Sequence, residues 1–211
     1  MSENMDLKSL EKKAYRSIFD DGLWDLFIGL VILSLGISTS LGSILNLSDP
    51  WIMVIPSAVL NILAFLLFYL GKKFVTIPRM GFVKFGPNRK SKQLKLKIFL
   101  FIFFFVNLIF AILPFTGLIR NIQLEPLLLT LFLGLGFLTF PFCVVAYFLD
   151  FSRLYYYALI AGIGFVLIDF LNPIVGVPLD TLFSFGAFGV VIISIGLYYF
   201  FRFIKKYPLS R

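Results

Sequence analysis

The sequence predicts an all-helical integral membrane protein with six transmembrane helices and both termini in the cytoplasm. Its 211 residues are 60% hydrophobic and only 14% charged, whereas typical soluble domains carry about 25% charged residues. Six apolar runs have about the 20-residue length that crosses a hydrocarbon core. The basic residues, finally, fall in alternate connections between these runs, which gives the protein an orientation.

Each apolar run is expected to be a helix, because a backbone in lipid must satisfy its own hydrogen bonds. The predicted spans are Leu23–Leu41, Trp51–Leu70, Ile98–Leu118, Leu127–Leu149, Leu154–Leu171 and Thr181–Phe203. A closed barrel would instead give weakly alternating runs of about ten residues. The predicted organisation is a cytoplasmic arm (1–22), one membrane domain (23–203) and a cytoplasmic tail (204–211). The polar arm lacks the pattern of a cleavable signal peptide.

The distribution of basic residues orients the predicted spans. Eighteen of the nineteen Lys and Arg residues fall in the arm, the second and fourth connections, and the C-terminal end, and Arg120 is the exception. The positive-inside rule then places both termini and the long connection 72–97 in the cytoplasm. We expect a protein of the cell (plasma or inner) membrane. Its net charge of +8 follows from topology, and no nucleic-acid-binding module is visible.

The N-terminal arm has apolar residues at helical spacing. These residues are Leu7, Leu10, Ala14, Ile18 and Phe19. The spacing predicts a short amphipathic helix, lying at the cytoplasmic interface or docking to a partner protein. Gly22 is expected to allow the turn from this arm into the first span.

The long connection 72–97 divides into two parts. In residues 74–85, Val, Ile and Phe interrupted by Pro78 and Gly81 favour a small hairpin or an extended loop over a helix. The second part has a basic cluster of Arg89, Lys90, Lys92, Lys95 and Lys97 without an acidic residue. Such a cluster is expected to contact anionic lipid headgroups, and simple retention on the cytoplasmic side is the alternative.

Few polar residues fall within the spans, and these are the usual indicators of a pathway or site. The candidates are Asn61, Asn107 and Asp169. Hydrogen bonding between helices is the alternative for the two asparagines, and an interfacial position is the alternative for Asp169. In the fifth span, Ala158 and Gly162 are four residues apart, a small-residue pair that allows close helix packing.

A second candidate site lies at the cytoplasmic face, and its residues are Asp20, Asp21, Asp25, Arg79 and Lys84. Asp21 and Asp25 share one helical face, and clustered carboxylates can hold Mg²⁺ and a phosphate-bearing headgroup. CDP-alcohol phosphotransferases have such an aspartate-rich motif, but the Ala-Arg pair after Asp-Gly and the later aspartates are absent here. Salt-bridged structural acids are therefore the alternative.

The chain has no histidine, which excludes His-ligated zinc, histidine general bases and the HExxH motif. It also lacks a nucleophile elbow and a P-loop. We accordingly expect no catalytic residue, no metal ligand and no cofactor.

Two segments, DGLWDLFIGL (21–30) and PRMGFVKF (78–85), carry a family resemblance. Together they resemble uncharacterised prokaryotic multi-spanning membrane proteins with an Asp-Gly-Leu start to the first span and a Pro-Arg-x-Gly-aromatic-Val-Lys cytoplasmic segment. The resemblance covers about the first hundred residues and implies no activity. It singles out Asp25, Arg79, Gly81 and Lys84.

Three functions stay open at this point. The first is a non-enzymatic membrane protein, either a small permease or an accessory subunit of a partner membrane protein. The second is a protein that binds or modifies lipid headgroups at the cytoplasmic face. The third is an oligomeric scaffold with a symmetric interface along the fifth or sixth span. The expected partners are the bilayer and its anionic lipids, and either a second copy or a membrane subunit.

Overall fold

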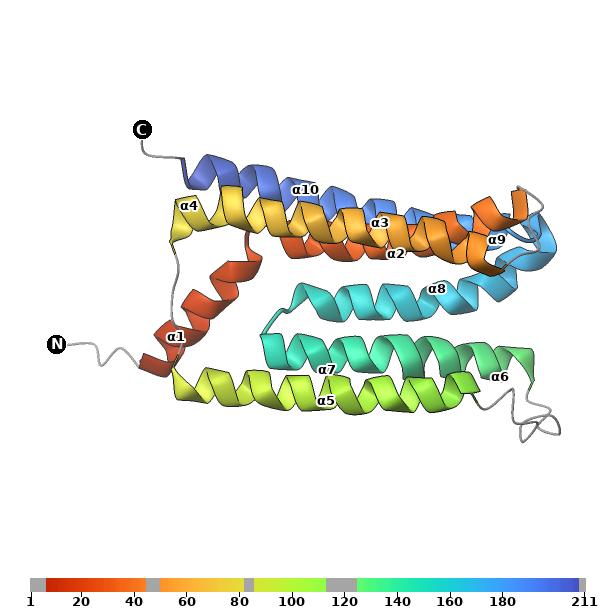
Figure 1. Ribbon diagram of the computed structural model, residues 1–211, viewed down its shortest axis with the longest axis horizontal. Coiled ribbons are helices and arrows are strands. Elements are labelled where there is room, and N and C mark those ends of the chain that lie inside the picture. Colours follow the sequence, from red (N-terminus) through yellow and green to blue (C-terminus); the bar gives the residue numbers. More distant parts are fainter. Residues whose placement is uncertain (1–6, 45–49, 82–85, 113–124, 209–211) are drawn as a thin grey trace. The chain divides into compact units, whose positions relative to one another are not determined.

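The computed structural model describes residues 7–44, 50–81, 86–112 and 125–208, and this part of the chain is all-α with no strand (Figure 1). The chain divides into two compact units. Unit 1 comprises residues 1–83 and 163–211, and unit 2 comprises residues 84–162. Each unit is described by itself below.

Unit 1 contains the two ends of the chain. Its helices are α1 (Leu7–Arg16), η1 (Ser17–Phe19), α2 (Leu23–Ile44), α3 (Pro50–Gly71), η2 (Lys72–Thr76), α4 (Ile77–Met80), the second half of α8 (Arg153–Val175), α9 (Leu179–Thr181), η5 (Leu182–Gly186) and α10 (Ala187–Lys206). The predicted helical arm is confirmed in α1 and η1. Of its apolar face, Phe19 is buried but Leu10 is 42% exposed.

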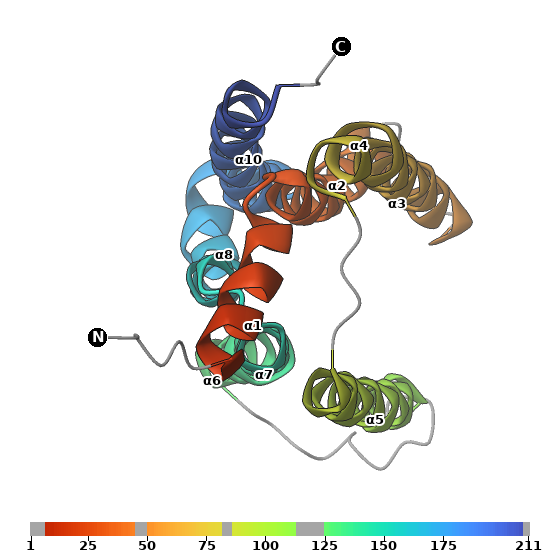
Figure 2. The same cartoon turned by 90° about the vertical axis from the view of Figure 1, so that its left-hand side faces the viewer.

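Helix α2 is the centre of unit 1, with α3 and α10 packed against it (Figure 2). The chain enters α2 through Gly22, whose φ of +71° confirms the predicted turn. A Cβ at Gly22 would also meet the backbone of Gly196 and Phe200 in α10. Glycine is therefore required at this position both for its backbone conformation and for close approach.

Glycines at intervals of seven residues line the contact of α2 with η5 and α10. A Cβ on Gly29 would lie 2.8 Å from the backbone nitrogen of Ile193, and one on Gly36 would lie 2.9 Å from that of Gly186. On the opposite side, a Cβ on Gly189 would lie 2.8 Å from Cα of Leu33. Small residues let membrane helices approach at backbone distance, and here the approach continues along most of the two helices.

The predicted hairpin or extended loop after the second span is wrong for the residues that the structure describes. The helix of α3 continues through the π-helical turn η2 and through α4, and ends at Gly81 with φ +75°. Proline clashes with the carbonyl four residues before it in a regular α-helix. The wider π turn lies directly before Pro78 and opens the helix there, so Pro78 does not end it.

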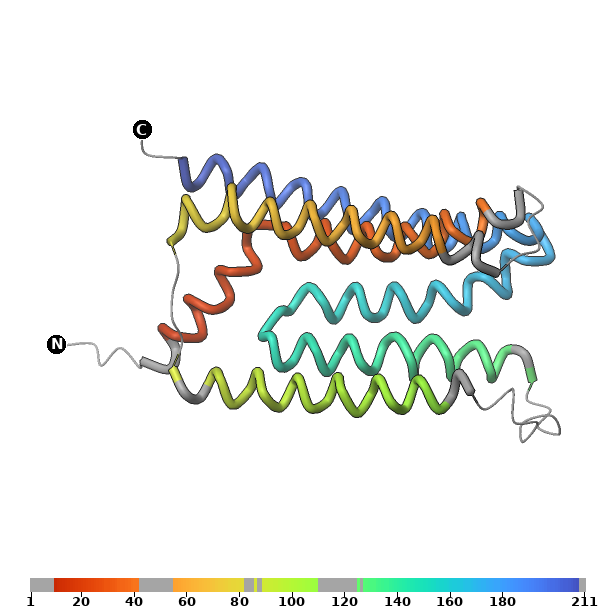
Figure 3. Tube along the Cα trace, in the orientation of Figure 1, coloured from red at the N-terminus to blue at the C-terminus, as the bar shows by residue number. Residues whose placement is uncertain are grey.

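Unit 2 contains α5 (Pro87–Ile112), α6 (Pro126–Leu131), η4 (Phe132–Thr139), α7 (Phe140–Leu149) and the first half of α8. In Figure 3, α6, η4 and α7 follow one another as one long helix. As in the second helix of unit 1, a π-helical segment precedes a proline, here Pro141. Phenylalanine rings pack between α5 and this helix. The ring centroids of Phe99 and Phe140 are 6.3 Å apart, and those of Phe103 and Phe137 are also 6.3 Å apart.

Five helices in the described part are long and apolar enough to cross a membrane. They cover Leu23–Leu41, Ile55–Met80, Leu127–Leu149, Arg153–Val175 and Leu179–Lys206. These ranges coincide with the predicted first and fourth spans and extend the fifth and sixth at both ends, while the second range begins later than predicted and continues to Met80. The predicted third span, Ile98–Leu118, is helical to Ile112, and residues 113–118 lie outside the described residues.

Candidate functional site

The strongest polar cluster of unit 1 is built around Asp21, which directly precedes Gly22 and the first turn of α2. Its carboxylate is fully buried. One oxygen, Oδ1, accepts a hydrogen bond from the backbone nitrogen of Leu23 at 3.2 Å. A carboxylate at this position caps a helix N-terminus and complements the helix dipole.

The other oxygen of Asp21 binds the end of the long helix that begins with α3. Lys72 Nζ donates to Oδ2 at 2.6 Å, and Thr76 Oγ1 donates to the same oxygen at 2.6 Å. Lys72 also donates to the carbonyl oxygen of Ile18 at 2.7 Å. We call Asp21, Lys72 and Thr76 the Asp21 cluster. It joins η1, the start of α2 and the π turn η2.

Asp25 lies one turn further along α2 and is also fully buried. Asp21 lies before the first residue of α2, and Gly22 between the two acids has a φ of +71°. A joint site of Asp21 and Asp25 therefore stays a prediction, and the ion pair that the structure shows is that of Asp21 with Lys72. Buried charges in proteins are held by such pairing.

The other predicted members of the cytoplasmic-face site are placed differently. Asp20 is exposed. Arg79 Nη1 donates to the carbonyl oxygen of Val75 in its own helix at 3.1 Å, and its buried Nε has no hydrogen-bond partner in the described part of the chain. Lys84 lies outside the described residues.

In unit 2, the basic cluster at the start of α5 meets an acid. Arg89 is 6% exposed and donates to Asp150 Oδ2 at 2.7 Å, while the half-exposed Lys92 lies 3.8 Å from the same oxygen. Asp150 ends α7 in the left-handed conformation, with φ +52°. Lys90, Lys95 and Lys97 are exposed, so headgroup contact stays a prediction that suits these three better than Arg89.

The polar residues predicted within the spans have separate local partners. Asn61 Oδ1 of α3 lies 3.5 Å from Ser34 Oγ of α2, an interhelical contact of the kind that the sequence predicts. Asn107 donates to the carbonyl oxygen of Phe103 in its own helix at 2.7 Å. Asp169 is exposed. No three His, Cys, Asp or Glu side chains gather as a metal-holding group in the described ranges.

Asp180 at the start of the last span is a further buried acid. It is 1% exposed. Its carboxylate accepts hydrogen bonds from the backbone nitrogen of Thr181 at 2.6 Å and from Asn172 Nδ2 at 3.1 Å. These hydrogen bonds connect the end of α8 to the start of the final helix, which indicates a structural role for Asp180.

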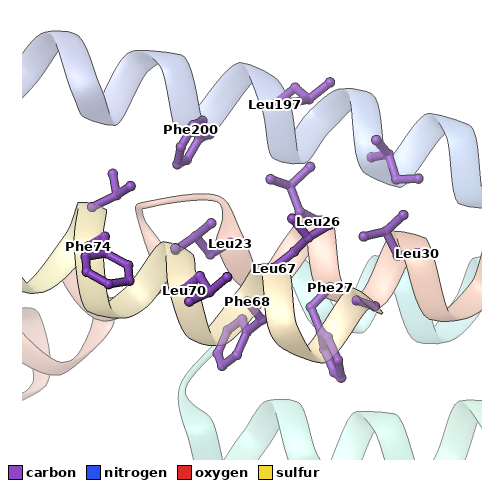
Figure 4. Close-up of a pocket in the computed structure, with 14 residues that line it drawn as sticks. Leu23, Leu26, Phe27, Leu30, Leu67, Phe68, Leu70, Phe74, Leu197 and Phe200 are labelled. Carbon is purple, nitrogen blue, oxygen red and sulfur yellow. The ribbon is translucent and has the colours of Figure 1, made fainter. Parts of the chain in front are cut away.

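A cavity of about 490 Å³ opens between α2, α3 and α10 (Figure 4). Its walls are apolar, with large side chains such as Leu26, Phe27, Leu67, Phe68 and Phe200. Asp25, Asp169 and Asn107 are absent from the lining. The polar clusters and the cavity are therefore separate features of unit 1.

Four polar residues of these sites were not singled out from the sequence. They are Lys72, Thr76, Asp150 and Asp180. Lys72 counted only as one of the topology-determining cations of the long connection, and 51 residues separate it from Asp21. The one available signal was a pair of lysines directly after a long apolar run, which predicts a membrane boundary and no partner.

No protein-family model, no curated protein and no solved structure matches this chain.

Proposed function

We propose that this chain is a non-enzymatic accessory subunit of the cell membrane, with six spans and both termini in the cytoplasm. The observation that supports the proposal is the hydrogen bonding of the acid at the start of the first span. Asp21 receives hydrogen bonds from Lys72, Thr76 and the backbone of Leu23. These acids act in holding helices together.

A carboxylate that binds Mg²⁺ or moves a proton must offer free lone pairs. An ionised carboxylate has about four acceptor sites, and three protein donors already occupy the Asp21 group. Asp150 and Asp180 likewise bind Arg89 and Thr181. The acids of both units thus favour a structural role over catalysis.

A transport role predicts a water-accessible cavity that reaches Asp25, Asp169 or Asn107. The cavity in unit 1 is lined by apolar side chains alone, and Asn107 is bonded within its own helix. An apolar cavity excludes water. The permease hypothesis therefore has less support than the accessory-subunit hypothesis.

Six spans and cytoplasmic termini are supported by two independent features. Five helices in the described residues have the length and hydropathy of spans, and most of the apolar third run lies in helix α5. Eighteen of nineteen basic residues fall on the side assigned to the cytoplasm, as the positive-inside rule requires.

Topology can be tested with reporter fusions in the connections. Fusions after residues 92 and 211 should report a cytoplasmic location, and fusions after residues 46 and 121 should report the opposite side. If the fusions at 92 and 211 lie on opposite faces, the six-span topology is wrong.

The accessory role can be tested by extracting the tagged full chain in a mild detergent and measuring the mass and composition of its complex. We expect a defined complex with a different membrane protein at fixed stoichiometry. A complex whose mass is a multiple of 24.1 kDa would instead support the scaffold hypothesis. A monomer after crosslinking in intact membranes would contradict both.

A further inference from the structure

We propose that the cavity between α2, α3 and α10 holds one acyl chain of an anionic phospholipid, whose phosphate lies beside Lys73. The proposal goes beyond an accessory role, because it assigns a ligand to a site that the polar clusters do not include. It depends on the lining, size and charge of the cavity.

The lining fits a hydrocarbon chain. Leu23, Leu26 and Leu30 of α2 form one wall, Ala64, Phe68 and Phe74 belong to another, and Leu197 and Phe200 of α10 complete it (Figure 4). No charged side chain lines the cavity. Within a bilayer, such a space is filled by apolar groups, because water finds no hydrogen-bond partner there.

The cavity has the size of a small-molecule site. The volume of about 490 Å³ lies within the range of small-molecule pockets, about 300–1,000 Å³. On α3 and η2 the lining runs from Ala64 to Val75, or about 16 Å of helix.

Two ammonium groups lie beside rings that line the cavity. Lys72 Nζ lies 5.7 Å from the centroid of the Phe68 ring, and Lys73 Nζ lies 5.5 Å from that of Phe74, and both rings line the cavity. Lys72 is paired with Asp21. Lys73 is exposed and has no acidic partner within the described residues.

Lys73 is therefore the cation available to a ligand beside the cavity. Arg202, two residues beyond Phe200 on α10, is also exposed. An apolar cavity with an exposed lysine beside one of its lining rings complements a phospholipid with an anionic headgroup. Basic residues at the membrane surface attract such lipids.

The proposal can be tested by native mass spectrometry of the purified full chain in detergent, with dioleoyl phosphatidylglycerol or dioleoyl phosphatidylcholine added in equal amounts. We expect one retained lipid, with phosphatidylglycerol preferred. Leu67→Trp projects a larger side chain into the cavity, and should reduce retention about tenfold, the effect of displacing two buried methylene groups. Leu197→Trp should act in the same way from α10.

Matched variants separate this site from lipid bound over the whole surface. Ile62→Trp changes an α3 residue that is 59% exposed, close to the 60% of Leu67, and does not line the cavity, so it should retain the lipid. Lys73→Gln should reduce the preference for phosphatidylglycerol about fivefold. Lys90→Gln, an exposed position of unit 2, should leave the preference unchanged.

Three outcomes would overturn the proposal. Equal retention by wild type, Leu67→Trp and Ile62→Trp would show surface lipid only. Equal retention of both lipids by wild type would remove the role of Lys73. A second protein chain that occupies the wild type without lipid and dissociates on Leu67→Trp would assign the cavity to a helix. Circular dichroism of each variant should show unchanged helicity, so that a loss of lipid reflects the cavity itself.

Discussion

Unit 1 and unit 2 are both bundles of apolar helices that contain a buried ion pair, but the α2–α10 contact of unit 1 and the α5 contact of unit 2 are packed in different ways. In unit 1, glycines bring α2 and α10 to backbone distance. In unit 2, phenylalanine rings fill the space between α5 and the α6–η4–α7 helix. Backbone contact leaves no room for adjustment, whereas rings can shift. Single substitutions at the α2–α10 contact should therefore cost more free energy of unfolding than those at the α5 contact.

The largest effect is expected for Lys72→Met in unit 1. This change leaves the fully buried Asp21 carboxylate without its cation, which costs about 3–5 kcal/mol in comparable buried pairs. Unfolding can be measured by titration with a denaturing detergent. Trp24 fluorescence serves as the signal, because its ring lies 4.7 Å from Phe68 and reports contact between α2 and α3.

Lys73→Met is the matched control for this prediction. It removes the neighbouring charge, which is exposed, and should change the free energy of unfolding by less than about 0.5 kcal/mol. The double variant Asp21→Asn with Lys72→Met should recover part of the loss, since neither charge then stays buried alone. Equal losses for Lys72→Met and Lys73→Met would show that the Asp21 cluster does not stabilise unit 1.

Gly189→Ala tests the glycine contact directly. Its Cβ would lie 2.8 Å from Leu33 Cα, so the helices must separate, at about 1–3 kcal/mol. Gly136→Ala in unit 2 is the matched control, because the nearest atom to its Cβ is the tip of Phe132 at 3.8 Å. We expect it to be neutral or to stabilise by up to about 1 kcal/mol. Thermal unfolding of both variants measures the two effects. A similar loss of stability in each variant would contradict the expected difference between the two contacts.

Arg89→Gln tests the ion pair of unit 2. It should cost about 1–3 kcal/mol, less than Lys72→Met, because Asp150 is 11% exposed and Lys92 lies 3.8 Å away as a second cation. The same detergent titration followed by circular dichroism measures the effect, with Lys90→Gln as the control. A larger loss for Arg89→Gln than for Lys72→Met would reverse the ranking of the two units.

The smallest effect is expected for Phe103→Leu. The Phe103 ring lies 5.9 Å from Phe99 and 6.3 Å from Phe137, and an aromatic pair contributes about 0.5–1.5 kcal/mol beyond its burial. Phe104→Leu, at a 61% exposed ring of the same helix, is the control and should have little effect on the melting temperature. A loss of several kcal/mol at Phe103 would mean that ring packing is as rigid as glycine packing.

The spans were predicted well where hydropathy alone determines them. The ranges Leu23–Leu41 and Leu127–Leu149 agree with the structure, because an apolar run of fixed length is the property that a bilayer selects. The second span was predicted to end at Leu70, since Lys72 and Lys73 follow. Its helix continues to Met80, because Asp21 compensates the Lys72 charge and the π turn admits Pro78.

The candidate site was predicted in part. The four-residue spacing singled out Asp21 and Asp25, and both are buried, but Gly22 with a φ of +71° separates Asp21 from α2. Lys72 was missed as the partner of Asp21 because 51 residues and a chain reversal separate the two. The seven-residue spacing of Gly22, Gly29 and Gly36 is visible in the sequence, but the helix that it faces depends on the tertiary fold.

The same glycine spacing has a mechanical consequence for unit 1. Sliding α10 along α2 by one residue, about 1.5 Å, would replace each glycine at the contact by a residue with a side chain, so the pair resists both shear and rotation. Helix α3 has large exposed side chains along its length, with the Asp21 cluster at one end and the cavity at its side. The α2–α10 pair is therefore the fixed part of unit 1, and the Asp21 cluster attaches the C-terminal end of α3 to it.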